Sequence, residues 1–209
     1  MLGAKPSSLL LANKTIWIEG ISDRLYIRHG LKLYFEFNQE RRKPIENLDY
    51  AFIEFSGSNL KHYLDSEKDI NINSINNCKN IFMIVDKDDS DKENSSKYKR
   101  YEEIQEKIKI GGGEFKITKG REIENYITPE ILRKIWPNLP IKIKEKNYLN
   151  KPLPKFLKQK GLENYISKDT FSSKKTIAEK IIEEQKNWSD LSSEMQELIS
   201  NLADFIKPN

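Results

Sequence analysis

The sequence has very few of the residues on which cysteine- and histidine-based chemistry depends. Among its 209 residues there is one cysteine, Cys78, and there are two histidines, His29 and His62. A single cysteine excludes an internal disulfide framework and a cysteine-based zinc site. Neither histidine has a partner at metal-ligand spacing, so we do not expect histidine-centred catalysis.

Long apolar runs, a leader peptide and a nucleotide-binding loop are also missing. The apolar runs are far shorter than a membrane span, and the first residues lack the apolar core of a signal peptide. Gly111-Gly112-Gly113 is not followed by the Lys-Ser/Thr pair of a phosphate-binding loop. We therefore expect a soluble, cytoplasmic protein with no membrane partner and no ATP site in this chain.

Short apolar runs alternate with helical patterns along the chain. Runs over residues 15–19, 50–55, 81–85 and 114–118 are rich in isoleucine, valine and aromatic residues, as buried parallel strands are. Helical periodicity follows the first strand, recurs at 97–109, and returns near the C-terminus in two helices. The fold class is therefore predicted to be α/β, an open and mainly parallel sheet of about four strands flanked by helices, with additional C-terminal helices.

Acidic residues follow three of these strands. They come in pairs along the chain, Glu19 and Asp23, Asp86 and Asp88, and Glu122 and Glu124. Ligands bind beyond the carboxyl ends of parallel strands, and strand alternation would place both aspartates of the second pair on one side. Carboxylates that meet there repel one another unless a hard cation lies between them. The pattern predicts a magnesium site at this edge of the sheet.

Each acidic pair taken alone also has a simpler interpretation. Asp23 can be a helix cap, the aspartate pair a solvated turn, and residues 121–126 a capped amphipathic helix. A calcium loop beginning at Asp86 is excluded, because Asp91 and Lys97 stand where glycine and glutamate are required. The order of the three pairs is more specific than any one of them.

Four segments together resemble the topoisomerase–primase (Toprim) domain. They are Ile18–Asp23, Phe55–Asn59, Val85–Asp88 and Arg121–Tyr126. The similarity is greatest to the nucleases of the OLD (overcoming lysogenization defect) family, including the Gabija-type defence nucleases. It covers residues 2–126 and resumes at 173–178.

The resemblance implies a nuclease that uses two divalent ions, Mg²⁺ or Mn²⁺. It places Glu19 and Asp23 in one metal-binding group, and Asp86 and Asp88 in the other group or shared between both. At least one of Glu122 and Glu124 is implied as a ligand, and we favour Glu124.

The resemblance also implies residues that support the substrate. A lysine at the start of a late helix would act in catalysis, with Lys174 the first choice and Lys175 the alternative. Gly57 and Ser58 would let the backbone approach a phosphate or a metal-bound water. Glu19 is implied in catalysis as well as in metal binding.

The resemblance divides the chain into four parts. Residues 1–13 resemble the connector between an ATPase and a Toprim domain, 14–136 form the Toprim core, 137–172 a lysine-rich insertion or loop, and 173–209 the helices that complete the domain. The ATPase half is absent, so the chain is either an excised domain or a relative whose ATPase partner is a separate chain.

The expected function is metal-dependent cleavage of nucleic acid, with DNA favoured over RNA, in an ATPase-coupled anti-phage defence or DNA-processing system. The basic stretch Lys142–Lys160 would track the phosphate backbone while Tyr148 or Phe156 stacks on bases. A ribonuclease for structured RNA and a non-catalytic module that docks on an ATPase remain open. The apolar stripe of the last helix predicts either core packing or a homodimer face.

Overall fold

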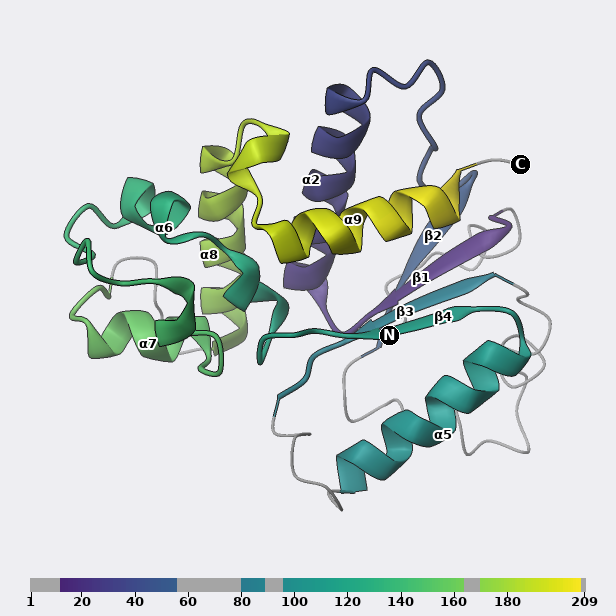
Figure 1. The fold of residues 1–209 in the computed structure, drawn as a ribbon, viewed down its shortest axis with the longest axis horizontal. Helices are drawn as coiled ribbons and strands as arrows, with labels where there is room; N and C mark the ends of the chain where they lie inside the picture. The colour runs from purple at the N-terminus through teal and green to yellow at the C-terminus, as the bar shows by residue number, and fades with distance from the viewer. Residues whose placement is uncertain (1–11, 56–79, 89–95, 164–169, 208–209) are drawn as a thin grey trace. The chain divides into compact units, whose positions relative to one another are not determined.

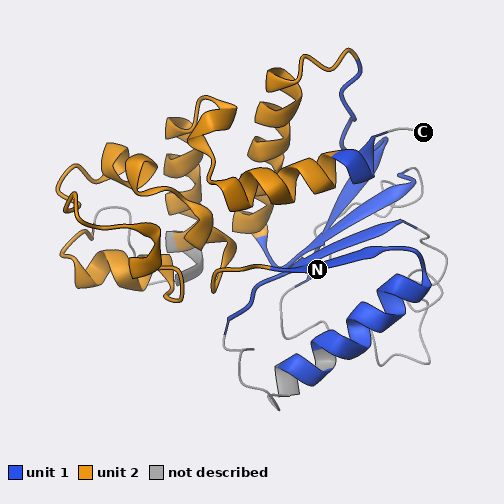
Figure 2. Ribbon diagram, viewed as in Figure 1, with its two compact units in different colours: residues 1–20, 42–117, 204–209 blue, residues 21–41, 118–203 orange. Residues whose placement is uncertain are grey.

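The chain adopts an α/β fold with a four-stranded, open, all-parallel sheet and flanking helices (Figure 1). The computed structural model describes residues 12–55, 80–88, 96–163 and 170–207. Within these ranges no helix has both the length and the apolar character needed to cross a membrane. The chain divides into two compact units, each built from separate stretches of sequence (Figure 2).

Unit 1 comprises residues 1–20, 42–117 and 204–209 and contains the sheet. The strands are β1 (Lys14–Ile18), β2 (Tyr50–Glu54), β3 (Ile81–Val85) and β4 (Glu114–Ile117), in the spatial order β2-β1-β3-β4. All neighbouring pairs are parallel. The sequence prediction of four strands is confirmed, with every strand boundary within one residue. β1, β2 and β3 are nearly continuous runs of buried residues, whereas in β4 only Phe115 is buried.

Helix α5 (Ser96–Ile110) packs against β4 and covers one face of the sheet. The core of this face contains apolar side chains from all four strands and from α5: Trp17, Ile53, Phe55, Ile81, Met83, Val85, Tyr101, Ile104, Ile108 and Phe115. The chain between α5 and β4 passes very close to β3, since a Cβ atom on Gly113 would lie 2.6 Å from the carbonyl oxygen of Ile81. Glycine is therefore required at this position.

Unit 2 comprises residues 21–41 and 118–203 and is helical. Its α-helices are α2 (Ile21–Phe37), α6 (Pro129–Ile135), α7 (Leu153–Gln159), α8 (Thr170–Glu184) and α9 (Ser193–Ile206). The last three residues of α9 belong to unit 1. Short 3₁₀ helices span Ile123–Tyr126, Glu145–Asn147 and Trp188–Asp190. Helix α8 packs on α2, α6 and α7 and is the centre of the unit.

The apolar stripe of α9 lies in the core. Leu191, Met195, Leu198 and Leu202 are all buried within the single chain. Of the two interpretations of this stripe, core packing is therefore confirmed. The spacing of Ser193 and Gln196 in the sequence suggests a capping box that begins at Ser193. The cap is instead Ser192, whose hydroxyl accepts the backbone N–H of Met195.

The region after residue 126 differs from expectation in two ways. The sequence suggests a short helix that begins near Glu122 and is interrupted by Pro129. Pro129 instead begins α6, where a missing N–H costs nothing and the side chain of Thr128 accepts from the backbone N–H of Ile131. The lysine-rich segment contains the 3₁₀ helix Glu145–Asn147 and α7, and Tyr148 and Phe156 are buried against each other with ring centroids 5.3 Å apart. The expectation that either ring stacks on bases is therefore wrong.

Candidate metal centre

In unit 1, Glu19 and Asp86 meet at the carboxyl ends of the neighbouring strands β1 and β3. The backbone N–H of Asp86 donates to Oε1 of Glu19 at 3.0 Å. The hydroxyl of Tyr101, on α5, lies 3.4 Å from the same Oε1 and 3.2 Å from the carbonyl oxygen of Asp86. This hydroxyl can donate to one of the two at a time, and either bond ties α5 to the acidic strand ends.

The environment of Tyr101 is acidic as well as buried. Burial raises the pKa of its hydroxyl, and the negative charges of Glu19, Asp88 and Asp86 raise it further. The hydroxyl therefore stays protonated and remains a hydrogen-bond donor to the carboxylate. No motif in the sequence singled out Tyr101, because it lies 82 positions from Glu19.

Asp88 does not continue the strand. β3 ends at Val85, and Asp88 has a φ of 46°, in the left-handed region that few non-glycine residues occupy. Strand alternation therefore does not extend to Asp88, and it is not what positions the side chains of Asp86 and Asp88 relative to each other. Aspartate is one of the residue types that tolerate this conformation, and such local strain is often found at functional sites.

In unit 2, the motif at residues 121–126 forms a tight 3₁₀ turn instead of the regular helix expected. Asn125 holds the turn closed, since its Oδ1 accepts the backbone N–H of Glu122 at 2.8 Å. The turn is crowded, because a Cβ atom on Gly120 would lie 2.8 Å from Cβ of Asn125. The result is that Glu122 and Glu124 are both buried, with exposed side-chain fractions of 8% and 1%.

Lys174 brings one positive charge to these two glutamates. Its Nζ lies 3.3 Å from Oε2 of Glu122 and 3.7 Å from Oε1 of Glu124. Lys175, the alternative, pairs instead with Glu179 on the exposed side of α8. The geometry therefore places Lys174, the first choice from the sequence, beside the two glutamates and Lys175 beside Glu179.

Glu124 lacks the hydrogen bonds that a buried carboxylate needs. Neither of its oxygens accepts a hydrogen bond from a residue that the structure describes, and its ion pair with Lys174 is long. The nearby hydroxyl of Tyr26 on α2 is also buried without a hydrogen-bond partner among the described residues. Burial raises the pKa of Tyr26, and the charges of Glu124, Asp23 and Glu122 raise it further. Burying such groups unsatisfied is costly, so the arrangement favours an additional ligand.

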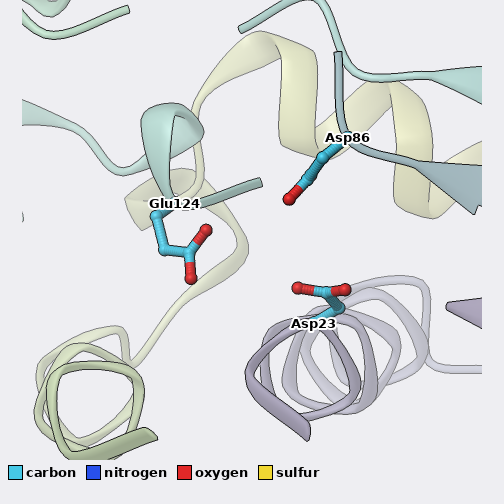
Figure 3. A group of neighbouring side chains, drawn as sticks. All are labelled: Asp23, Asp86 and Glu124. Atoms are coloured by element: carbon cyan, nitrogen blue, oxygen red, sulfur yellow. The ribbon is translucent and has the colours of Figure 1, made fainter. Parts of the chain in front are cut away.

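Asp23, Asp86 and Glu124 form a buried acidic triad (Figure 3). One carboxylate oxygen from each residue lies within 4.8 Å of those of the other two. Asp23 comes from the first turn of α2, Asp86 from the residue after β3, and Glu124 from the 3₁₀ turn. An all-carboxylate group of this kind is a donor set that suits Mg²⁺ or Mn²⁺.

The remaining predicted residues are placed less directly. Glu19 accepts a hydrogen bond from the backbone N–H of Asp86, and Glu122 forms an ion pair with Lys174, but neither glutamate is part of the triad. Gly57 and Ser58, proposed to support a phosphate, lie outside the described residues. No motif in the sequence marked Tyr26 or Tyr101 as functional, and the spacing of Tyr26 indicates only the buried face of its helix.

Comparisons with known proteins returned no relatives: no protein-family model matches the chain, and neither a curated protein nor a solved structure matches it.

Proposed function

We propose that the protein is a Toprim-type nuclease that hydrolyses phosphodiester bonds of DNA with two divalent metal ions. The observation that carries the proposal is the buried Glu124 carboxylate, which accepts no hydrogen bond from the described residues and lies within 4.8 Å of Asp23 and Asp86. The motif order, with acids after β1, β3 and β4, supports the same assignment. So does the all-parallel sheet, at whose carboxyl edge ligands bind.

The donor set fits Mg²⁺ or Mn²⁺ better than other biological metals. The proposed ligands are all carboxylates, and hard cations prefer oxygen. Three buried carboxylates that share one small volume repel one another, and a divalent cation offsets that repulsion. Asp23, Asp86 and Glu124 would hold one ion, with Glu19, Asp88 and Glu122 available to the second.

Two bound ions would supply an activated water and stabilise the leaving oxygen, as in other two-metal hydrolases. The protein's own residues would position these groups. Tyr101 and the backbone N–H of Asp86 fix the Glu19 carboxylate in one orientation. Lys174, which pairs with Glu122 and Glu124, would place its positive charge where negative charge develops on the scissile phosphate.

The DNA-processing role proposed for the protein is coupled to an ATPase partner, in the same chain or a separate one. A function in anti-phage defence follows from the same proposed family. Two other candidates share the acidic centre: a ribonuclease that acts on structured RNA, and a non-catalytic module whose metal is structural.

The test is a nicking assay on supercoiled plasmid with Mg²⁺, with Mn²⁺ and with chelator. Asp86→Asn and Glu124→Gln keep side-chain size and remove charge, and we expect each to lower the nicking rate by at least about 100-fold. Glu179→Gln is the matched control, because Glu179 is an exposed glutamate paired with Lys175. Circular dichroism would verify that all variants fold.

The outcomes separate the three candidates. Metal-dependent nicking that is lost in both site variants and kept in Glu179→Gln supports the proposal. Wild-type rates in both site variants would exclude the centre as catalytic. Faster cleavage of structured RNA than of DNA favours the ribonuclease, and metal binding without cleavage of either substrate favours the non-catalytic module.

A further inference from the structure

The segment from Lys142 to Lys160 carries an unusual density of positive charge. It contains seven lysines and one acidic residue, Glu145. All seven lysines have exposed side chains, and they are Lys142, Lys144, Lys146, Lys151, Lys155, Lys158 and Lys160. We name this set the lysine surface.

The lysines of this surface differ from many other described lysines in forming no ion pair with a described carboxylate. Lys32, Lys180 and Lys207 each pair with an acid three or four residues away in sequence, at 4.0, 2.8 and 3.2 Å. Among the residues that the structure describes, none of the seven forms an ion pair. Within the described part of the chain their charges are therefore not paired with carboxylates, and they produce a positive potential that attracts a polyanion.

The lysine surface is a folded part of unit 2. Leu153, Phe156 and Leu157 turn one side of α7 into the core, whereas Lys155 and Lys158 lie one turn apart on the opposite side. The ring of Tyr148 packs on Phe156 and its hydroxyl donates to the carbonyl oxygen of Ile127. The lysines are consequently presented by a packed scaffold.

This scaffold is bonded directly to the motif that carries Glu122 and Glu124. The side-chain amide of Asn125 donates to the carbonyl oxygens of Tyr148 and Lys151, at 2.8 and 2.9 Å. The backbone N–H of Arg121 donates to the carbonyl oxygen of Leu149 at 2.8 Å. A polyanion on the lysine surface would therefore be held at a fixed distance from the acidic motif.

The lysine surface offers positive charge to a bound nucleic acid but no exposed aromatic side chain from the same segment. Both aromatic side chains of the segment, Tyr148 and Phe156, are buried, with exposed fractions of 0% and 1%. Proteins that hold single strands combine a basic groove with exposed aromatic side chains, on which unpaired bases stack. A surface of lysines alone suits a duplex, whose bases are already stacked and whose outside is phosphate.

We propose that the lysine surface binds the phosphate backbone of duplex DNA and guides it to the acidic centre. The choice of DNA rests on the proposed function, while the duplex form and the phosphate contacts rest on the lysines and the buried rings. The binding is electrostatic, independent of sequence and weakened by salt.

The test measures binding of a labelled duplex to the full chain by fluorescence anisotropy in EDTA at several KCl concentrations. The variant carries Lys151→Gln, Lys155→Gln and Lys158→Gln. We expect its affinity to fall on the order of tenfold, and the slope of log K against log[salt] to fall by about 2 to 3, if each lysine contacts one phosphate. The control carries Lys32→Gln, Lys180→Gln and Lys207→Gln, which removes the same charge, and its affinity should change by less than about twofold.

A second variant separates charge from folding. The variant with Lys151→Arg, Lys155→Arg and Lys158→Arg keeps the charge, so it should retain binding within about threefold. Equal losses in the glutamine variant and the control, or no loss in either, would overturn the proposal, as would tighter binding of single-stranded DNA or duplex RNA.

Because EDTA removes the metal ions that hydrolysis needs, the assay measures binding separately from cleavage. Duplex binding that depends on the three lysines, in a protein that cleaves no substrate, would support the lysine surface and overturn the proposed nuclease function. Cleavage by the wild type, together with unchanged binding in the glutamine variant, would support the nuclease function and overturn the lysine surface.

Discussion

Asn125 donates a hydrogen bond from its side-chain amide to the carbonyl oxygen of Tyr148 at 2.8 Å. The same amide reaches Lys151, and its oxygen accepts the N–H of Glu122. One buried side chain therefore links the acidic motif to the lysine surface. Backbone groups that would otherwise be buried without partners depend on it.

Replacing Asn125 by alanine should destabilise the protein by about 2–4 kcal/mol. The substitution leaves the N–H of Glu122 and the carbonyl oxygens of Tyr148 and Lys151 without their partner, and each unsatisfied buried group is costly. Urea unfolding measures the change. Asn150→Ala, at an exposed position in the same segment, should change stability by less than about 0.5 kcal/mol. Equal effects of the two substitutions would contradict the linking role of Asn125.

Replacing Glu124 by glutamine should abolish stabilisation by metal without lowering stability in its absence. At a Mn²⁺ concentration about 100 times Kd, the wild type gains about 2.7 kcal/mol, which raises Tm by about 5–10 °C. The variant should show no such rise. In EDTA its Tm should equal or exceed that of the wild type, because one of three mutually repelling carboxylates is neutral.

Differential scanning fluorimetry with and without Mn²⁺ measures both effects, and Glu179→Gln serves as control. A wild type whose Tm does not respond to Mn²⁺ or Mg²⁺ would argue against the metal centre. A Glu124→Gln protein that is much less stable in EDTA would show that the carboxylate has a structural partner instead.

Lys174 and Lys175 should differ sharply in their effect on cleavage. Methionine at position 174 removes the charge that faces Glu122 and Glu124, so we expect the single-turnover rate to fall by about 100-fold or more. Methionine at position 175 removes only the exposed pair with Glu179, so the rate should change by less than about threefold. Metal affinity, measured by calorimetry, should not weaken in Lys174→Met. The reverse order of the two rates would move the role to Lys175.

Acid should destabilise the fold in part through His29. Burial lowers the pKa of its ring below the ordinary value of 6.5, while Nε2 lies 2.9 Å from the carbonyl oxygen of Gln185. The folded pKa is below the unfolded one, so protons favour the unfolded chain, and the stability is retained above pH 6.5 and lost as the pH falls below it.

The measurement for His29 is the free energy of unfolding in urea between pH 8 and pH 5, values that lie about equally far on either side of the ordinary histidine pKa. His29→Gln keeps an N–H donor and has no titrating ring. Its stability should therefore fall less steeply over this range than that of the wild type. Parallel curves for the two proteins would remove His29 as a cause.

The strands and most helices could be predicted because their signals are local. β3 is a run of five buried apolar residues, and its bounds were predicted without error. Pro129 was misinterpreted for a local reason as well, since proline can both break a helix and begin one, and the hydroxyl of Thr128 decides in favour of the start. The segment after residue 137 was expected as an insertion or loop, because its many lysines and prolines hide a short apolar pattern at Leu153, Phe156 and Leu157.

The acidic centre was predicted in outline and resolved only by packing. The order of the acids along the chain and their position after the strands could be predicted from the sequence. Which acids meet depends on packing: Asp86 joins Asp23 and Glu124 in the triad, whereas Asp88, whose backbone is in the left-handed conformation, is not part of it. Tyr101 comes from α5, 82 positions from Glu19, and Tyr26 on α2 meets Glu124 from a distant part of the chain.

The amino-acid sequence by itself determined the α/β class, the four strands and the charges at their ends, because hydrophobic periodicity acts over windows of a few residues. The tertiary structure decided that Lys174 rather than Lys175 meets the glutamates, that Tyr148 and Phe156 are buried, and that Asn125 joins the lysine surface to the acidic motif. Those outcomes depend on which side of each helix is buried and on hydrogen bonds between residues distant in sequence, and both are set by the packing of the whole unit.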